Sequence, residues 1–309
     1  MSVLTKTYRG VFPIAPTPFA ADGAVDWASL DKLFEFYATI GSDGITVLGI
    51  MGEAPKLEPH ESLEILKRAV KILGKPVIVG VSAPGFAAMR SLSREAMAAG
   101  AASVMIAPPN TLRTDDQITG YYAQAVEAIG ADVPFVIQDY PLITSVQMTP
   151  GVIRKIVTDN ASCVMLKAED WPGLEKISLL RKWQQEGSLR DLAIMTANGG
   201  LFLDFEMDRG ADGSNTGYAF PEMLIDVVRL AKAGNRDAAH DLFDAHLPLL
   251  RYEQQPGVGL AVRKYVMMKR GILASDAQRK PGGTLSATAK AEVDYLLARL
   301  AKADKRARI

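Results

Sequence analysis

Eight short apolar runs, separated by stretches with helical periodicity, constrain the fold of this chain more than any other feature of its sequence. Apolar runs bounded by turn residues are typical of strands that are buried on both faces of a parallel sheet. A glycine before most of the runs is the expected stop of the preceding helix. The predicted strands are Val11–Pro16, Gly44–Gly49, Pro76–Val81, Ser103–Ala107, Val133–Gln138, Ser162–Lys167, Leu192–Ala197 and Asp212–Thr216.

Strands that alternate with helices in this way predict parallel pairing through helical crossovers. Eight such units predict an α/β fold, a (β/α)8 TIM barrel, over residues 1–233. Residues 234–309 are then expected to form a C-terminal helical extension. Its predicted helices are Asn235–Glu253, Gly257–Arg270 and Ser286–Leu300, and the basic tail from Lys302 to Arg308 is expected to be a solvated, frayed end.

Charge and composition exclude several classes of protein. The 309 residues include 35 basic and 35 acidic side chains, so nothing favours a nucleic-acid or membrane partner. The single cysteine, Cys163, excludes an internal disulfide and is expected to be a small buried hydrophobe. No signal peptide, long apolar span or zinc-binding spacing occurs. We therefore expect a cytoplasmic protein without a metal or cofactor.

The sixth apolar run ends on Lys167, although lysine is among the residues that are least often fully buried. A functional explanation is an amine kept in a low dielectric, which disfavours its charged form. A neutral amine attacks carbonyl carbons and forms Schiff bases. The alternative is a lysine that extends to the surface or pairs with Glu169 or Asp170.

Polar side chains gather at the ends of the fifth and sixth predicted strands, where catalytic residues of this fold are found. Strand alternation places Gln138 and Tyr140 on one face, and Lys167 and Glu169 on one face of the next strand. Neighbouring strands lie about 4.8 Å apart. An amide, a phenol, an amine and a carboxylate are therefore expected to converge on one pocket.

Two further strand ends offer groups that can bind a substrate. The turn Gly49-Ile50-Met51-Gly52 is expected to expose backbone N–H groups that can hold a carboxylate, although this short motif is a weak signal by itself. Asn215 and Thr216, at the end of the eighth strand, can bind substrate hydroxyls. Ordinary turn chemistry explains Asn215 and Thr216 equally well.

These features resemble the dihydrodipicolinate synthase and N-acetylneuraminate lyase superfamily of pyruvate-type class I aldolases and dehydratases. The shared landmarks are the opening Gly10–Phe19, the Gly-x-x-Gly-Glu turn at 49–53, Pro141 after strand five and Lys167 on strand six. The resemblance covers nearly the whole chain. It implies that Lys167 forms a Schiff base with a 2-keto acid, and that the chain forms a homo-oligomer, a dimer or tetramer.

The chain also departs from the pattern of the synthases. Ile50 and Met51 stand where the family has two threonines, Gln138 aligns with its proton-relay tyrosine, and Ile143 aligns with the arginine that binds the second substrate. Pro109 and Asn110 replace the tyrosines after strand four. The motifs Gln-Asp-x-Pro and Lys-x-Glu instead resemble the 2-keto-3-deoxy-sugar-acid dehydratase branch, in particular 2-keto-3-deoxy-L-arabinonate dehydratases.

The resemblance implies a lyase that dehydrates, or cleaves by a retro-aldol step, a 2-keto-3-deoxy sugar acid through an imine on Lys167. Glu169 is our choice for acid/base work, and Gln138 for orienting a hydroxyl or water, because an amide does not titrate near neutral pH. Tyr140 either acts with them or packs beside Pro141. Two alternatives stay open: a synthase that condenses pyruvate with an aldehyde, and a catalytically silent binding protein. The sequence leaves the sugar acid and its stereochemistry open.

Overall fold

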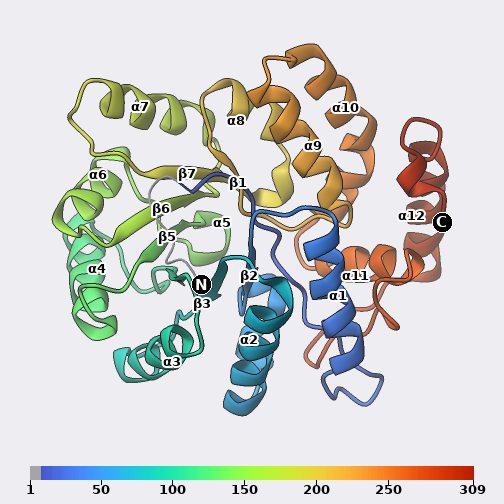
Figure 1. Cartoon of the computed structure of the whole chain (residues 1–309), viewed down its shortest axis with the longest axis horizontal. Helices are drawn as coiled ribbons and strands as arrows, with labels where there is room; N and C mark the ends of the chain where they lie inside the picture. The colour runs from blue at the N-terminus through green and yellow to red at the C-terminus, as the bar shows by residue number, and fades with distance from the viewer. Residues whose placement is uncertain (1–7) are drawn as a thin grey trace.

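The computed structural model describes residues 8–309 as a ring of eight short parallel strands surrounded by helices (Figure 1). The strands pair in the order β1-β8-β7-β6-β5-β4-β3-β2, and a parallel bridge between Ile14 and Thr46 closes the ring. Each strand overlaps one of the predicted runs, so the TIM-barrel prediction is confirmed. The strands are β1 Gly10–Val11, β2 Ile45–Val47, β3 Val77–Gly80, β4 Ser103–Ile106, β5 Phe135–Asp139, β6 Cys163–Ala168, β7 Ala193–Thr196 and β8 Gly213–Ser214.

The first strand is shorter than predicted because proline residues interrupt it. Pro13 has no N–H group, so it cannot donate to a ladder of hydrogen bonds. The chain nevertheless keeps its place beside β8, since the N–H groups of Phe12 and Ile14 donate to the carbonyls of Ser214 and Thr216. The barrel is thus continuous past the formal end of β1.

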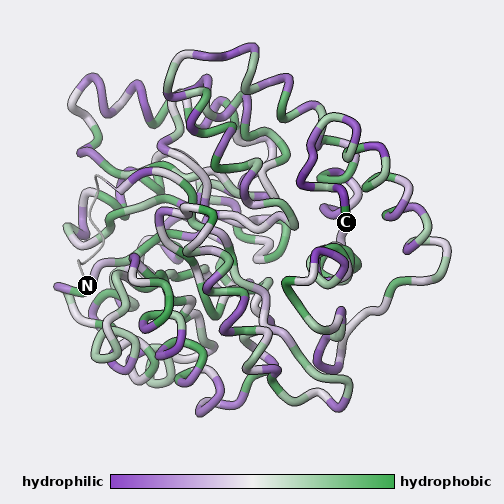
Figure 2. The backbone as a smooth tube through the Cα atoms, turned by 45° about the vertical axis from the view of Figure 1, so that its right-hand side comes forward, coloured by the Kyte–Doolittle hydropathy of each residue, from purple (hydrophilic) through white to green (hydrophobic). Residues whose placement is uncertain are grey.

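The inside of the barrel is filled by one apolar cluster, distinct from the larger core between strands and helices. It consists of Phe12, Ile78, Ala102, Met105, Val136, Met165, Ala193 and Met195. Hydrophobic and hydrophilic residues alternate along the helical coils at the outside of the molecule (Figure 2). Gln138 and Lys167 follow Val136 and Met165 at a spacing of two, so they continue the inward-facing rows. The alternation therefore brings two polar groups to one end of the apolar barrel.

Helices cover the barrel and extend it on one side, where α10–α12 and the C-terminus gather (Figure 1). The three C-terminal helices agree with prediction to within two residues, whereas the division at residue 233 stays a prediction. The helices are α1 Trp27–Thr39, α2 Pro59–Leu73, α3 Phe86–Ala98, α4 Asp115–Ile129, α5 Pro141–Thr144, α6 Pro150–Asp159, α7 Leu174–Gln185, α8 Leu203–Asp208, α9 Pro221–Lys232, α10 Arg236–Glu253, α11 Gly259–Lys269 and α12 Ala287–Leu300, with single turns of 3-10 helix η1 Ile50–Gly52, η2 Ala54–Lys56, η3 Asn198–Gly200 and η4 Lys305–Ala307.

The prediction of a frayed C-terminal tail is wrong. Arg306 forms ion pairs with Asp226 of α9 at 2.8 Å and with Asp304 at 2.6 Å, and Ala307 is buried. The side chain of Asp304 also caps η4 by accepting from the N–H of Arg306. Arg306 thus has an acidic partner on a neighbouring helix, which the sequence pattern alone does not reveal.

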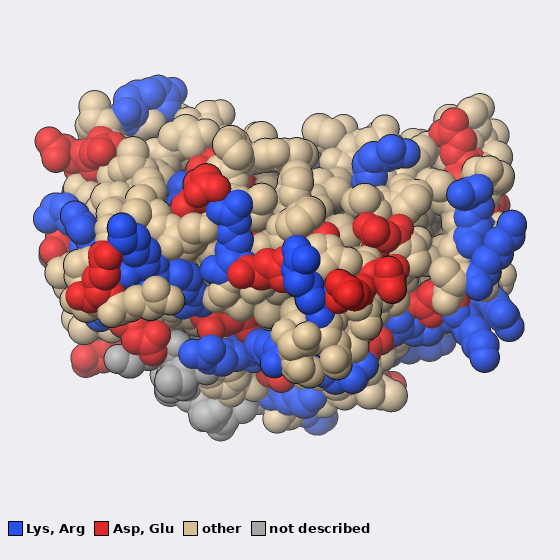
Figure 3. All heavy atoms as spheres, turned by 90° about the horizontal axis from the view of Figure 1, so that it is seen from above, with Lys and Arg blue, Asp and Glu red and all other residues tan. Residues whose placement is uncertain are grey.

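The surface carries both signs of charge. On the face shown in Figure 3, acidic and basic side chains lie side by side across the middle, with other residues between and above them. Within residues 8–309, no helix has the length and apolar character needed to cross a bilayer. The same residues contain no group of three or more His, Cys, Asp or Glu side chains arranged to hold a metal ion.

Candidate active site

Lys167 lies at the C-terminal end of β6, inside the mouth of the barrel, and only 3% of it is exposed. The strand register pairs it with Gln138 on β5 and Met195 on β7. Its Nζ lies 3.0 Å from Oε2 of Glu169, which is also buried. Of the two alternatives for this lysine, extension to the surface is excluded, while the ion pair with Glu169 is present. The amine faces a pocket in the mouth of the barrel.

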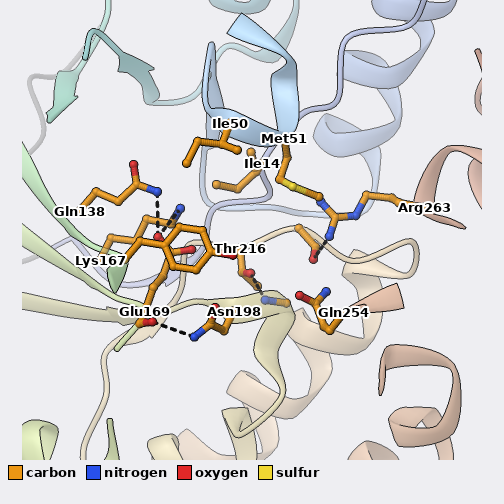
Figure 4. Close-up of a pocket in the computed structure, with 13 residues that line it drawn as sticks. Ile14, Ile50, Met51, Gln138, Lys167, Glu169, Asn198, Thr216, Gln254 and Arg263 are labelled. Carbon is orange, nitrogen blue, oxygen red and sulfur yellow. Dashed lines mark hydrogen bonds and ion pairs between the residues drawn. The ribbon is translucent and has the colours of Figure 1, made fainter. Parts of the chain in front are cut away.

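Gln138 and Lys167 both contact the same oxygen of Glu169 (Figure 4). Nε2 of Gln138 donates to Oε2 of Glu169 at 2.8 Å. The backbone of Glu169 is held as well, because its N–H donates to the carbonyl of Asp139 at 2.9 Å and its carbonyl accepts from Nδ2 of Asn198 at 2.8 Å. The carboxylate is therefore fixed beside the amine, within the distance that proton transfer needs.

A buried ion cluster lies behind Glu169 and ties the ends of β5 and β6 together. Nζ of Lys176, on α7, lies 2.7 Å from Oδ2 of Asp139 and 2.5 Å from Oδ2 of Asp170, and donates to the carbonyl of Met148 at 2.7 Å. Burial raises the pKa of Asp139 to about 6, and Lys176 opposes that rise. Asp139 follows Gln138 and Asp170 follows Glu169 in sequence, so the cluster links the backbone next to both residues.

Tyr140 lines the same pocket, although β5 ends one residue before it. Burial, and secondarily the nearby carboxylate of Glu169, raise the pKa of Tyr140 to about 12. Its hydroxyl is therefore protonated at neutral pH and can donate a hydrogen bond into the pocket. The structure thus brings together all four residues for which we predicted catalytic roles.

The turn after β2 presents two free backbone donors to the pocket. Ile50 and Met51 line the pocket, and within the described chain their N–H groups have no hydrogen-bond partner. The N–H groups of Gly52 and Glu53 are used inside the turn, where they donate to the carbonyls of Gly49 and Ile50 at 3.0 Å. The two glycines thus shape the turn and do not line the pocket. Two adjacent free N–H groups can receive a carboxylate.

Glu53 anchors this turn to the C-terminal extension. Its carboxylate pairs with Lys56 at 2.8 Å and with Lys264 of α11 at 2.5 Å. Both Glu53 and Lys264 are buried. The backbone of Glu53 is left-handed, with φ at 56°, so the residue also reverses the chain at this point.

The two residues predicted at the end of strand eight have different surroundings. Thr216 lines the pocket, and its Oγ1 accepts from the N–H of Gly199 at 2.7 Å. Asn215 does not line the pocket. It is fully buried, and its Oδ1 accepts from Oγ1 of Thr46 at 2.9 Å. Binding of a substrate hydroxyl by Asn215 remains a prediction, and the geometry gives it no direct contact with the pocket.

Six residues that line the pocket were missed by the sequence predictions: Ile14, Asn198, Gly199, Gly217, Gln254 and Arg263. Asn198 lies two residues past the end of β7, so its position near a strand end was an available signal. Arg263 stands in the apolar helical stretch Gly259–Met268, and a cation among apolar residues also calls for a partner or a function. Gln254 carries no signal, since it follows the last residue of a surface helix.

Comparison with known proteins agrees with this geometry. The model of the dihydrodipicolinate synthetase family matches residues 7–300. The chain is 28% identical to an L-2-keto-3-deoxyarabonate dehydratase of Azospirillum brasilense, over 96% of each chain. It is 26% identical to a 4-hydroxy-tetrahydrodipicolinate synthase of Bifidobacterium longum, over 88% of this chain and 87% of the other.

A solved structure gives a further match. The crystal structure of a dihydrodipicolinate synthase from Rhodopseudomonas palustris superposes with a TM-score of 0.96 and 65% sequence identity, over 97% of this chain and 100% of that one. The match to the family model covers far more than half of the chain, as the motifs at strands two, five and six predicted. The chain therefore belongs to the dihydrodipicolinate synthetase family, and it is a lyase of the Schiff-base-forming kind.

Proposed function

We propose that the protein dehydrates a 2-keto-3-deoxy sugar acid through an imine on Lys167. The observation that carries this proposal is the buried amine of Lys167, held 3.0 Å from Glu169 at the floor of a pocket in the barrel mouth. The Azospirillum brasilense relative is named for a reaction on such an acid, and it aligns over 96% of this chain.

The ion pair between Lys167 and Glu169 supplies the proton transfer that starts the reaction. A proton passes from the ammonium of Lys167 to the carboxylate, which leaves a neutral amine. The amine attacks C2 of the keto acid, and the resulting carbinolamine loses water to give an iminium. Gln138 holds the receiving oxygen of Glu169 at 2.8 Å, so the carboxylate stays in place during these steps.

The iminium then withdraws electrons from C3 and acidifies its protons. Glu169, once ionised again, removes one C3 proton and gives an enamine. The enamine expels the C4 hydroxyl, which leaves as water after taking a proton from Glu169 or from the hydroxyl of Tyr140. If the C3–C4 bond of the iminium broke instead, with the C4 hydroxyl giving its proton to Glu169, an aldehyde would leave and the remaining enamine would be protonated at C3 and hydrolysed to pyruvate, which is the aldolase outcome.

The free N–H groups of Ile50 and Met51 are the proposed site for the C1 carboxylate of the substrate. The family's threonine hydroxyls are replaced here by apolar side chains. Binding of the carboxylate therefore depends on backbone donors alone. The reaction then requires that the turn keep its backbone conformation.

Reductive trapping tests the imine. Borohydride added to protein and pyruvate is expected to leave a stable adduct on Lys167, found by peptide mass spectrometry, and Lys167→Ala is expected to lose both the adduct and turnover. Lys155→Ala, at an exposed lysine on α6, is the matched control and should behave as wild type. A wild-type protein without an adduct would favour the silent binding protein and would reject the proposal.

A second candidate is the condensing synthase, favoured by the name of the Rhodopseudomonas palustris structure at 65% identity. Against it, Ile143 occupies the position expected for the arginine of the synthases, is 55% exposed and does not line the pocket. Product analysis separates the two. Conversion of a 2-keto-3-deoxy acid to a semialdehyde without free pyruvate means dehydration, whereas consumption of pyruvate together with an aldehyde means condensation.

We further infer that the substrate is a small 2-keto acid handled by a homo-oligomer, a dimer or tetramer, in the cytoplasm. The family membership supports a small-molecule substrate. Sedimentation of the purified protein tests the oligomeric state, and a monomer would reject that part of the inference.

A further inference from the structure

Two hydrogen-bond donors from the C-terminal extension enter the pocket without protein partners. Within residues 8–309, Nη1 of Arg263 and Nε2 of Gln254 are buried and have no hydrogen-bond partner. Both residues line the same pocket as Lys167. A buried donor without an acceptor is costly, so two in one pocket point to an acceptor that a ligand brings.

The guanidinium of Arg263 is held rigidly with this one nitrogen free. Its Nε donates to Oε1 of Glu253 at 2.6 Å, and its Nη2 donates to the carbonyl of Gly217 at 2.6 Å. Only 2% of Arg263 is exposed. The partners on Nε and Nη2 fix the plane of the group, and the remaining N–H bonds of Nη1 are left for the pocket.

Two glycines make room for these donors. A Cβ atom at Gly217 would lie 2.0 Å from Nη1 of Arg263, and one at Gly199 would lie 2.0 Å from Nε2 of Gln254. Any other residue at Gly217 or Gly199 would push the donor aside. The backbone of the barrel is thus shaped to admit side chains from the extension.

The donors lie away from the proposed chemistry. Figure 4 shows Arg263 and Gln254 on one side of the pocket, and Lys167, Gln138 and Glu169 on the other. The turn residues Ile50 and Met51, with their own free N–H groups, lie above and between them. A keto acid bound to Lys167 through C2 and to that turn through C1 therefore has only its far end left for Arg263 and Gln254.

We propose that Arg263 and Gln254 bind acceptor oxygens at the end of the substrate remote from C2, and so select the sugar acid. This inference rests on the proposed function, because it needs C2 bound at Lys167. A terminal hydroxyl and a terminal carboxylate share the required chemistry, since both offer lone pairs to N–H donors. Pyruvate has neither group on the side of C2 remote from its C1 carboxylate, so Arg263 and Gln254 do not contribute to its binding.

The experiment compares long and short keto acids on two variants. Arg263→Lys keeps a cation for Glu253 but loses the forked group, and Gln254→Leu removes the amide while leaving the Arg263–Glu253 pair intact. Each is assayed with 2-keto-3-deoxy acids ending in CH2OH, with acids ending in a second carboxylate, and by borohydride trapping of pyruvate. The matched controls are the exposed neighbours, Arg251→Lys and Gln255→Leu.

We expect kcat/KM for the long acids to fall by about tenfold or more in both variants, with KM changing more than kcat. The acid class that loses most identifies the end group. Pyruvate trapping at Lys167 should keep its wild-type concentration dependence. If Arg263→Lys does not fold, Gln254→Leu alone decides the matter.

Two results would overturn the inference while leaving the imine chemistry intact. One is a loss of pyruvate trapping equal to the loss on long acids. That result would mean that the two residues bind the keto-acid part shared by all substrates, or stabilise the fold. The other is unchanged kcat/KM for every long acid. Absence of trapping in the wild-type protein would instead reject the proposed function, and this inference with it.

Discussion

Replacing Lys176 by methionine is the sharpest test of how the site is held together. Among the ion pairs of the described residues, Lys176 is the single cation between the carboxylate of Asp139, which is buried, and that of Asp170, which is 11% exposed. Methionine keeps the length and apolar stem of the side chain but removes the charge, two hydrogen bonds and the ion pair with Asp170. The two carboxylates would then face each other in a buried site without compensation.

The expected loss of stability is large. Asp139 is 0% exposed, and burial already raises its pKa from an ordinary value of 3.8 to about 6 with Lys176 in place. A rise of about two units corresponds to roughly 3 kcal/mol for ionising this carboxyl in the folded protein. Removing one partner of a buried ion pair costs about 3–5 kcal/mol. We therefore expect the free energy of unfolding to fall by about 3 kcal/mol at pH 8.

The loss should depend on pH in a definite direction. Because the folded-state pKa of Asp139 is raised, its contribution to stability is greatest below pH 4 and declines as the pH rises through about 6. Without Lys176 that pKa rises further, so the decline continues to higher pH. At pH 5 most Asp139 is protonated in either protein. The difference between variant and wild type should therefore be smaller at pH 5 than at pH 8.

Urea unfolding followed by circular dichroism at pH 5 and pH 8 measures both quantities. Lys182→Met is the matched control, because Lys182 lies on the same helix, is exposed and meets Glu186 only at 3.7 Å. It should change the free energy of unfolding by less than about 0.5 kcal/mol. An equal loss for Lys176→Met at both pH values, or a loss no larger than that of the control, would refute the account of a charge-compensated cluster.

Three further predictions concern the chemistry and the barrel. Glu169→Gln should lower kcat by about 100-fold or more in steady-state assays, because proton transfer is lost, and near-normal kinetics would reject that role. Tyr140→Phe should lower kcat by about tenfold while pyruvate is still trapped on Lys167, if its hydroxyl donates to the leaving group; unchanged kcat would mean that Tyr140 only packs. Gly80→Ala should lower the free energy of unfolding by about 2–3 kcal/mol, since its Cβ would lie 2.2 Å from the backbone oxygen of Leu48. Gly85→Ala, with no atom within 4 Å of its Cβ, is the control, and equal losses in the two variants would contradict the steric argument.

Sequence periodicity predicted the barrel and the centre of the site because both follow from local rules. Strand alternation placed Gln138 and Lys167 on inward-facing rows, and the structure pairs them in register. The same rule brought Glu169 to the amine. These residues lie within one or two positions of a strand end, where the fold itself fixes the direction of the side chain.

Alternation could not predict contacts made across the barrel. Asn215 and Thr216 are adjacent in sequence, yet one bonds Thr46 inside the barrel and the other lines the pocket. Arg263 and Gln254 reach the site from α11 and the end of α10, whose positions depend on how the extension packs. No local pattern encodes that packing, so long-range partners such as Glu53 and Lys264 appear only in three dimensions.

The origin of Arg263 and Gln254 in a different part of the chain from Lys167 has an evolutionary consequence. If Arg263 and Gln254 select the substrate as we propose, substitutions in the last third of the chain change which keto acid is accepted without disturbing Lys167 or Glu169. Related enzymes that share the barrel could then differ in substrate preference while they keep the same reaction. Swapping residues 234–309 between two such enzymes would transfer preference along with the exchanged segment.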